Sequence, residues 1–339
     1  MRIQSAKLKL VTKNLTLLLT LLLASLNSLE SWSSGNAGGG GSTSNTGSAK
    51  TGEANPKFME KAIEEKRLAA QKQLQELSKQ KQSGNIVDPA KDFDHSHKKW
   101  TELLQVHVRM IRDGKSSEVD YKNFNRPKLQ EYLSELTTVT ESKFQTFSRE
   151  QKFAYLINGY NAFTIELILR NYPLKSIKKI GGFLSSPWSI EFVKMRGVEV
   201  SLDTVEHKWI RKEGKFKDPR AHFALNCASI GCPALRPEAF LASKLDAQLE
   251  EATIQFLKDE QRNKWDSKKK QLEVSSIFKW FREDFSSANS SFKDLHEFFL
   301  RYSKLVWKEV DGISALIPNA DIDFLDYDWN LNDLSKQAN

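Results

Sequence analysis

The stretch HFALNCASIGCPALRP, residues 222 to 237, carries both cysteines of this 339-residue chain. Cys227 and Cys232 are separated by four residues, and His222 stands shortly before the first of them. A thiol near an imidazole could serve as a nucleophile. Two thiols in an exported protein could form a structural disulfide, and thiols with His207 and His222 could bind zinc. The residue types leave these three chemistries open, whereas the C-x-x-C spacing of a redox pair is absent.

A base for Cys227 must come from another part of the chain. Residues 220–227 (RAHFALNC) are predicted to form a strand, in which side chains alternate between the two faces. His222 would then face away from Cys227 and could not take its proton. His207 is the better candidate base, although it lies twenty residues earlier.

The residues around His207 have helical spacing. Asp203 lies four residues before it and Arg211 four residues after it, on one face of a predicted helix. A carboxylate at that spacing can orient an imidazole. Glu206 is turned about 100° away by the geometry of an α-helix, so we expect it to act elsewhere.

Asn158 and Asn161 lie three residues apart within a segment, 148–173, that is apolar on nearly every face. Such a helix is buried, so each amide must find partners or cost about 1–3 kcal/mol. Ser148 and Gln151 have the spacing of a capping box at its start, and Pro173 stops it. The two amides could hold neighbouring backbone, or they could line a polar site.

These residues outline a thiol-dependent acyl transferase or hydrolase. Cys227 would be the nucleophile and His207 the base, while Asn161 would orient the base or donate to an oxyanion. The predicted substrate-binding residues are Asn158, Glu206, Arg220, His222, Asn226 and Arg236, with Arg220 or Arg236 binding an anionic group. The rival hypothesis is a non-catalytic binding or scaffold module with a structural Cys227–Cys232 disulfide.

The elements that must position these residues are mostly helices. Helices are predicted from Trp100 to Ile111, from Pro127, from near Ser201, within 236–261, and over 275–285 and 291–307. In the helix over 275–285, Trp280 and Phe281 are expected to pack in the core. A hairpin is predicted around Arg196-Gly197, and strands at 269–274 and in the acidic end, where Tyr327 and Trp329 would lie on a solvated strand edge. The predicted fold class is α+β: a helix-rich single domain with a few short strands.

The chain before this domain has a different composition. Residues 1–33 have a basic head followed by a short apolar run, the anatomy of a signal peptide that directs export to a periplasmic or secreted location. Residues 34–56 form a Gly/Ser-rich linker, residues 57–86 a charged helical lead-in, and residues 87–339 the globular domain. Residues 57–82 could bind a protein partner, and a membrane is involved only if the signal stays uncleaved.

Charge narrows the choice of partners. The formal net charge is +8, of which residues 1–33 contribute +3 from four cations and one acid, which leaves +5 for the rest. These remaining cations are interleaved with acids rather than gathered in a stripe. Together with export, this pattern argues against nucleic acid as a partner. We expect a small-molecule or peptide substrate of unknown identity, with no cofactor and no metal.

The chain resembles a known family through the segments YLINGYNAFTIELIL, VSLDTVEHKWIR, DPRAHFALNCASIGCPALRPEAF, IFKWFREDF and DYDWNLN. Over residues 95–332 it is similar to the domain-of-unknown-function 547 family. The resemblance identifies the domain but no activity. It implies that these positions matter: Asn158, Tyr160, Asn161, Glu206, His207, Arg211, Arg220, His222, Asn226, Cys227, Pro233 and Arg236.

Two further points follow from the resemblance. Relatives can carry serine at the position of Cys232 while keeping the first cysteine, which favours a role for Cys227 itself over an obligatory disulfide. Gly159 departs from the family pattern, because a larger residue is usual there. It lowers local helix propensity by about 1 kcal/mol and leaves room for a close neighbour.

Overall fold

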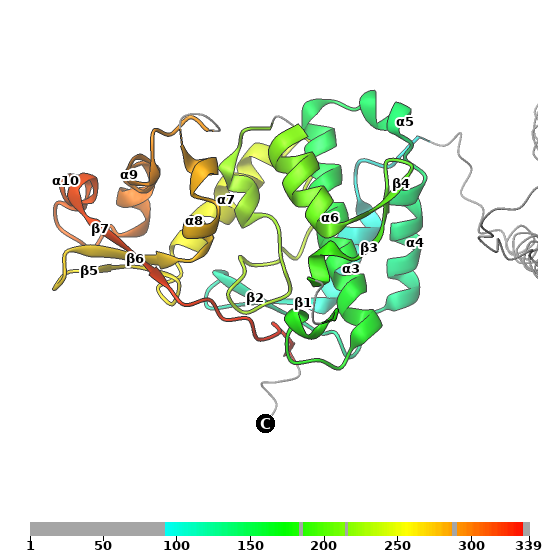
Figure 1. Ribbon diagram of the computed structural model, residues 1–339, viewed down its shortest axis with the longest axis horizontal. Helices are drawn as coiled ribbons and strands as arrows, with labels where there is room; N and C mark the ends of the chain where they lie inside the picture. The colour runs from blue at the N-terminus through cyan, green and yellow to red at the C-terminus, as the bar shows by residue number, and fades with distance from the viewer. Residues whose placement is uncertain (1–91, 183–185, 214–215, 287–289, 335–339) are drawn as a thin grey trace, which may run out of the picture. The chain divides into compact units, whose positions relative to one another are not determined.

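The computed structural model describes residues 92–182, 186–213, 216–286 and 290–334 (Figure 1). The predicted signal peptide 1–33, linker 34–56 and lead-in 57–86 lie outside these residues. All described residues belong to one compact unit, Gln80–Asn339. Helices and short strands alternate along it, so the predicted α+β class is confirmed.

The first core forms around α6 (Arg149–Asn171), where almost every side chain from Phe153 to Ile168 is buried. Both bonds of the capping box between Ser148 and Gln151 are present, as predicted. Helices α3 (Lys98–His107), α4 (Arg126–Thr137) and α5 (Glu141–Gln145) pack into the same core. The methyl end of Met195 occupies the space that Gly159 leaves open, so the expected close neighbour of this glycine is present.

The predicted first helix ends earlier than expected. It stops at His107, and Val108–Ile111 form β1, which pairs antiparallel with β2 (Ser116–Val119). His107 is buried at the end of the helix, and its Nε2 accepts a hydrogen bond from the backbone N–H of Asn125. The apolar residues after His107 therefore face the core from a strand.

A second hairpin leads directly toward the candidate site. Strands β3 (Glu191–Met195) and β4 (Val198–Ser201) pair antiparallel, and Arg196 and Gly197 both have positive φ at the turn, so the predicted hairpin is confirmed. The helix that follows is a π-helix, Thr204–Glu213, rather than an α-helix. π-Helical turns are rare and are frequent at functional sites.

The prediction of a strand over residues 220–227 is wrong. Residues Pro219–Phe223 form a 3-10 helix, whose first turn is capped by the side chain of Asp218, and a loop follows. Proline fixes a backbone angle suited to the start of a helix, and aspartate is a favoured cap. The apolar residues Ala221 and Phe223 are buried from this helical turn, which explains why the composition resembled a strand.

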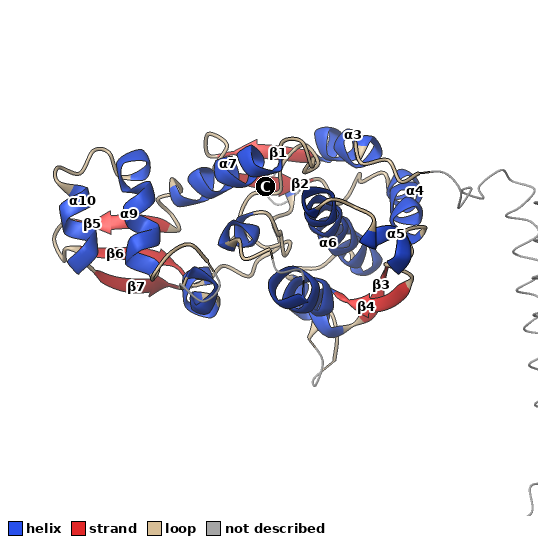
Figure 2. Ribbon diagram, turned by 90° about the horizontal axis from the view of Figure 1, so that it is seen from above, coloured by secondary structure: helices blue, strands red, loops and turns tan. Residues whose placement is uncertain are grey.

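The second core is built from phenylalanines around a three-stranded sheet. The order is β5 (Asn263–Asp266), β6 (Gln271–Ser275), β7 (Asp321–Leu325), with β6 antiparallel to β5 and parallel to β7. Helices α9 (Leu295–Val306) and α10 (Ile313–Leu316) lie over one face of this sheet (Figures 1 and 2). Helix α7 (Leu245–Leu257) contacts both α9 and the 3-10 helix that carries His222.

The expected helix over 275–285 is broken. Residues Ile277–Trp280 form the short helix α8, and Arg282–Phe285 form a 3-10 turn. The predicted strands at 269–274 and in the acidic end correspond to β6 and β7. Among the described residues, no helix has both the length and the apolar character required to cross a membrane.

Candidate functional site

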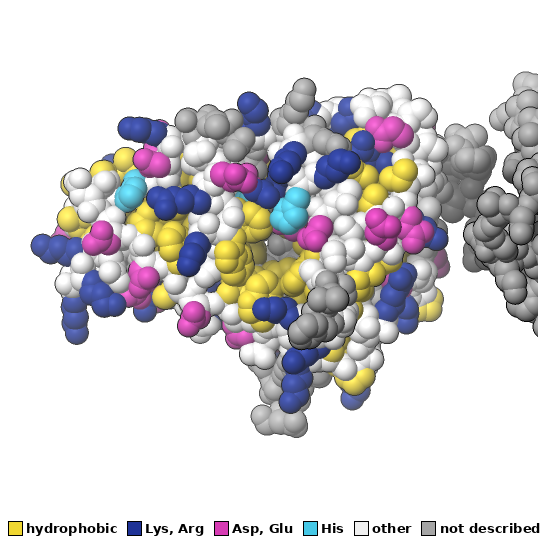
Figure 3. Space-filling view, in the orientation of Figure 1, with side chains coloured by type: hydrophobic (Ala, Val, Ile, Leu, Met, Phe, Trp, Pro, Cys, Tyr) yellow, Lys and Arg dark blue, Asp and Glu magenta, His cyan; other side chains and the backbone are white. Residues whose placement is uncertain are grey.

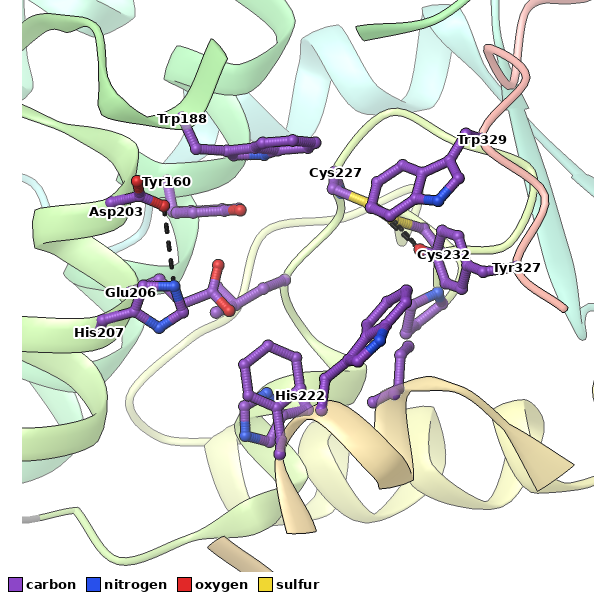
Figure 4. A pocket seen from close by; sticks show the side chains of 15 residues that line it. Tyr160, Trp188, Asp203, Glu206, His207, His222, Cys227, Cys232, Tyr327 and Trp329 are labelled. Carbon is purple, nitrogen blue, oxygen red and sulfur yellow. Dashed lines mark hydrogen bonds and ion pairs between the residues drawn. A yellow bond between two sulfur atoms is a disulfide. The ribbon is translucent and has the colours of Figure 1, made fainter. Parts of the chain in front are cut away.

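A pocket of about 210 Å³ lies where α6, the π-helix, the cysteine loop, α8 and the segment after β7 meet. The space-filling view shows a hollow edged with hydrophobic side chains, with a histidine and an acidic side chain near its rim (Figure 3). Figure 4 shows the pocket from close by. Its lining residues are Tyr160, Trp188, Asp203, Glu206, His207, His222, Leu225, Cys227, Cys232, Pro233, Ile277, Trp280, Phe281, Tyr327 and Trp329.

One wall of the pocket is acidic and comes from the π-helix. Asp203, Glu206 and His207 all line it, and Oδ1 of Asp203 lies 3.7 Å from Nε2 of His207. The predicted pairing of Asp203 with His207 is therefore present. The expectation that Glu206 would act elsewhere is wrong, because Glu206 lines the same pocket as Asp203 and His207.

The hydrogen bonds of His207 determine what its ring can do. Nη1 of Arg211 lies 3.0 Å from Nδ1 of His207. Because arginine only donates, Nδ1 must accept, and the proton of a neutral ring lies on Nε2, toward Asp203. In this arrangement, neither ring nitrogen presents a free lone pair to the pocket.

Burial changes the acidity of two groups on this wall. Burial raises the pKa of Asp203, and the neighbouring Glu206 raises it further, while His207 opposes both effects; the net pKa is above the ordinary value. Burial also raises the pKa of Tyr160, and the negative charge of the nearby Glu206 raises it further. Tyr160 therefore stays protonated and can donate to the carboxylate of Glu206, which Figure 4 shows directed into the cavity.

The opposite wall contains sulfur. Cys227 and Cys232 form a disulfide, so this alternative is confirmed in the structure. The hydroxyl of Tyr327 lies 3.2 Å from Sγ of Cys227 and 3.1 Å from Sγ of Cys232. The bond leaves neither sulfur as a thiolate, which removes both the nucleophile and the thiolate ligands of a zinc site in this form.

Aromatic rings line much of the remaining wall. The ring centroids of Trp280 and Trp329 are 5.7 Å apart, those of Tyr327 and Trp329 4.5 Å apart, and those of Trp188 and Trp329 5.6 Å apart. Trp280, which was expected in the core, is 47% exposed, and that expectation is wrong. Phe281 is likewise only partly buried, and it lines the pocket.

Sequence reasoning missed this aromatic wall. Tyr327 and Trp329 were expected on a solvated strand edge, yet they follow β7 and reach the pocket. The motifs IFKWFREDF and DYDWNLN contained these rings, but nothing local showed that they would meet.

His222 lies at another side of the same pocket as Cys227, contrary to the prediction from an alternating strand. Its Nε2 lies 2.7 Å from Oδ2 of Asp284, and its ring stacks on Phe281 at 4.0 Å. Burial raises the pKa of Asp284, but hydrogen bonds from His222 and Arg211 outweigh it and lower the pKa to about 2.

The predicted amides hold backbone. Asn161 Nδ2 donates to the carbonyl of Ala224, and its Oδ1 accepts from the N–H of Asn226. Asn158 makes the same pair of bonds to the backbone of Phe240. The side chain of Asn226 closes the cysteine loop by donating to the carbonyl of Pro233 and accepting from the N–H of Ala228. Asn158 and Asn161 therefore hold neighbouring backbone, which is the first of the two roles considered for them.

The two predicted arginines lie outside the lining of the pocket. Arg220 is paired with Asp218, Asp246 and Glu250. Arg236 is paired with Glu238 and Glu251. Each guanidinium is therefore already neutralised by carboxylates of its own chain.

The fold and the pocket define the class: a helix-rich α+β domain with a pocket formed by an acidic wall, a disulfide and aromatic rings. Residues 144–257 match the family model described as protein of unknown function, DUF547, which confirms the resemblance expected from the motifs. The matched segment contains α6, the π-helix and the cysteine loop. No curated protein and no solved structure matches the chain.

Proposed function

We propose that this protein is an exported binding module whose pocket takes a small organic molecule. The observation that carries the proposal is the Cys227–Cys232 disulfide in the pocket wall, because a sulfur bonded to sulfur is not a nucleophile. The hydrogen bond from Arg211 to Nδ1 of His207 supports it, since it occupies the lone pair that a base would need while the proton of the neutral ring lies on Nε2. The pocket volume, about 210 Å³, is below the usual range for drug-sized ligands, so the ligand is small.

Export is part of the same proposal. The basic and apolar head of the chain supports it, and so does the disulfide, because such bonds persist in oxidising compartments. Residues 57–82 would then be available to a protein partner outside the cytoplasm.

The state of the cysteines is the first test. Natively exported protein is treated with an alkylating reagent, with and without reductant, and its intact mass is measured. We expect no alkylation without reductant and two alkylated cysteines after reduction. A free Cys227 in the untreated protein would overturn the proposal.

Binding of a panel of small cationic, anionic and uncharged organic fragments is measured by ligand-observed NMR. We expect a subset of fragments to bind wild-type protein and to lose binding in the Trp280→Leu variant. Because Trp280 is exposed, this variant should fold normally, which circular dichroism would verify. If no fragment distinguishes the two proteins, the pocket is not a binding site.

A second candidate function rests on the fact that Cys227 and His207 line the same pocket. After a dithiol reductant opens the disulfide and Arg211 releases Nδ1 of His207, Cys227 could give its proton to that nitrogen and attack the carbonyl carbon of an ester or amide. The bond to the alcohol or amine would break, and that leaving group would take the proton from His207. Water would then hydrolyse the thioester and restore the thiol.

In this second reading, Asn161 is a positioning residue for the loop that carries Cys227. The test uses reduced protein and p-nitrophenyl acetate. A thiol enzyme should lose all turnover with Cys227→Ser and keep it with Cys232→Ser. Equal rates in the two variants would exclude Cys227 as the nucleophile.

A further inference from the structure

Resting on the proposed function, we propose that the pocket binds a small organic ammonium ion, with its charge held between the acidic wall and the faces of the tryptophans. The inference concerns the chemical class of the ligand and depends on three features of the pocket.

The first feature is an unbalanced negative charge. Asp203 and Glu206 both line the pocket, and among the described residues that line it there is no lysine and no arginine. His222 is bonded to Asp284, which also binds Arg211, so these groups neutralise one another. Arg211 lies close enough to attract Glu206, but its guanidinium is already paired with Glu283 and Asp284. A ligand cation would supply the charge that this wall lacks.

The second feature is the type and arrangement of the rings. Three tryptophans, Trp188, Trp280 and Trp329, line one cavity together with Tyr327. Trp188 meets Trp329 at an interplanar angle of 61°, and Tyr327 meets it at 49°. Rings at such angles present faces and edges to one space. Tryptophan is the best aromatic partner for a cation, and cages of such rings recognise quaternary ammonium groups.

The third feature is that cations of the chain itself already lie close to two of the aromatic rings that line the pocket. The ammonium group of Lys178 lies 4.8 Å from the ring centroid of Trp329, and the guanidinium of Arg211 lies 5.0 Å from that of Phe281. Both distances are within the range of cation–π attraction. The same rings would attract a cation that enters the pocket.

The test compares choline with its uncharged isostere, 3,3-dimethylbutan-1-ol, by isothermal titration calorimetry on the full chain with its disulfide intact. The two molecules have the same shape, so the difference between them reports the charge. We expect choline to bind at least tenfold more tightly than the isostere, and tetramethylammonium to compete with it.

Two variants examine the walls separately. Glu206→Gln keeps the size of the side chain and removes its charge; it should weaken choline on the order of tenfold and leave the isostere unchanged. Glu309→Gln, at an exposed position outside the pocket, is the matched control and should change neither. Trp280→Leu should also weaken choline on the order of tenfold, and Trp280→Phe should restore much of the binding.

Failure of the inference differs from failure of the proposed function. If the isostere binds as tightly as choline, the pocket is a binding site but not one that selects cations. If choline does not bind while uncharged fragments of the panel do, the proposed ligand class is wrong and the proposed binding function still holds. If no probe of either kind binds, both proposals are wrong.

Discussion

Oδ1 of Asn161 accepts a hydrogen bond of 2.9 Å from the backbone N–H of Asn226. Together with the bond from Asn161 Nδ2 to the carbonyl of Ala224, it fastens the residues that precede Cys227 to the middle of α6. The buried helix thus sets the position of the cysteine loop.

Removing this clamp should destabilise the fold. Asn161→Ala leaves a buried N–H and a buried carbonyl without partners, so we expect the free energy of unfolding to fall by about 2–4 kcal/mol. Urea denaturation would measure it. Asn123→Ala, at an exposed position whose side chain bonds to Asp120, is the control and should change stability by less than about 0.5 kcal/mol. An equal effect of both variants would contradict the clamp.

Stability should fall at acid pH through Asp284. Its pKa in the folded protein is lowered to about 2 from the ordinary 3.8. A carboxyl with a lowered pKa stabilises the fold above pH 4 and loses this contribution as the pH falls toward 2. The change corresponds to about 2 kcal/mol. Measured by denaturation between pH 2 and 5, the free energy of unfolding should change less steeply with pH in Asp284→Asn than in the wild type. Parallel slopes would show that other carboxyls are responsible.

Gly231 allows Tyr327 to approach the disulfide. A Cβ at this position would lie 2.9 Å from Cζ and Cε1 of the Tyr327 ring. We expect Gly231→Ala to lower the free energy of unfolding by about 1–3 kcal/mol, because the ring must move while its hydroxyl is bonded to the sulfurs. In a Tyr327→Ala background the same substitution should cost much less, and a double-mutant cycle would measure the difference. Additive effects would refute the contact.

Arg220 should act on stability. It is only 18% exposed and is paired with Asp218, which is 15% exposed. Arg220→Gln leaves this carboxylate without its cation, and we expect a loss of about 1–3 kcal/mol in chemical denaturation. Lys98→Gln, in an exposed pair with Glu102, is the control and should have little effect. Loss of fragment binding in Arg220→Gln without loss of stability would instead favour the predicted role in substrate binding.

The elements that the sequence predicted well are those with local signals. The capping box of Ser148 and Gln151 marks the start of α6, and Arg196-Gly197 marks the hairpin turn, because each depends on a few neighbouring residues. Residues 220–227 were predicted to form a strand because burying a short helical turn, here Pro219–Phe223, needs the same apolar residues. Pro219 and the packing of this segment against α7 favour the helical turn.

The candidate site was predictable only in part. The contact between Asp203 and His207 follows from spacing within one helix. Glu206 lines the pocket as well, although its spacing from His207 predicted that it would act elsewhere. Trp280 and Trp329 lie in separate segments and meet because β7 pairs with β6. Such a contact is fixed by tertiary structure, and no periodicity in either segment encodes it.

The parallel pairing of β7 with β6 has a consequence for the newly made chain. Tyr327 and Trp329 follow β7, so the ribosome adds them about a hundred residues after Cys227. Because α6, the cysteine loop and β7 belong to one compact unit, and domains generally fold as units, the pocket cannot be complete until this last segment has been made. The rings that complete the pocket arrive last. A chain still being translated thus lacks the aromatic wall of the pocket.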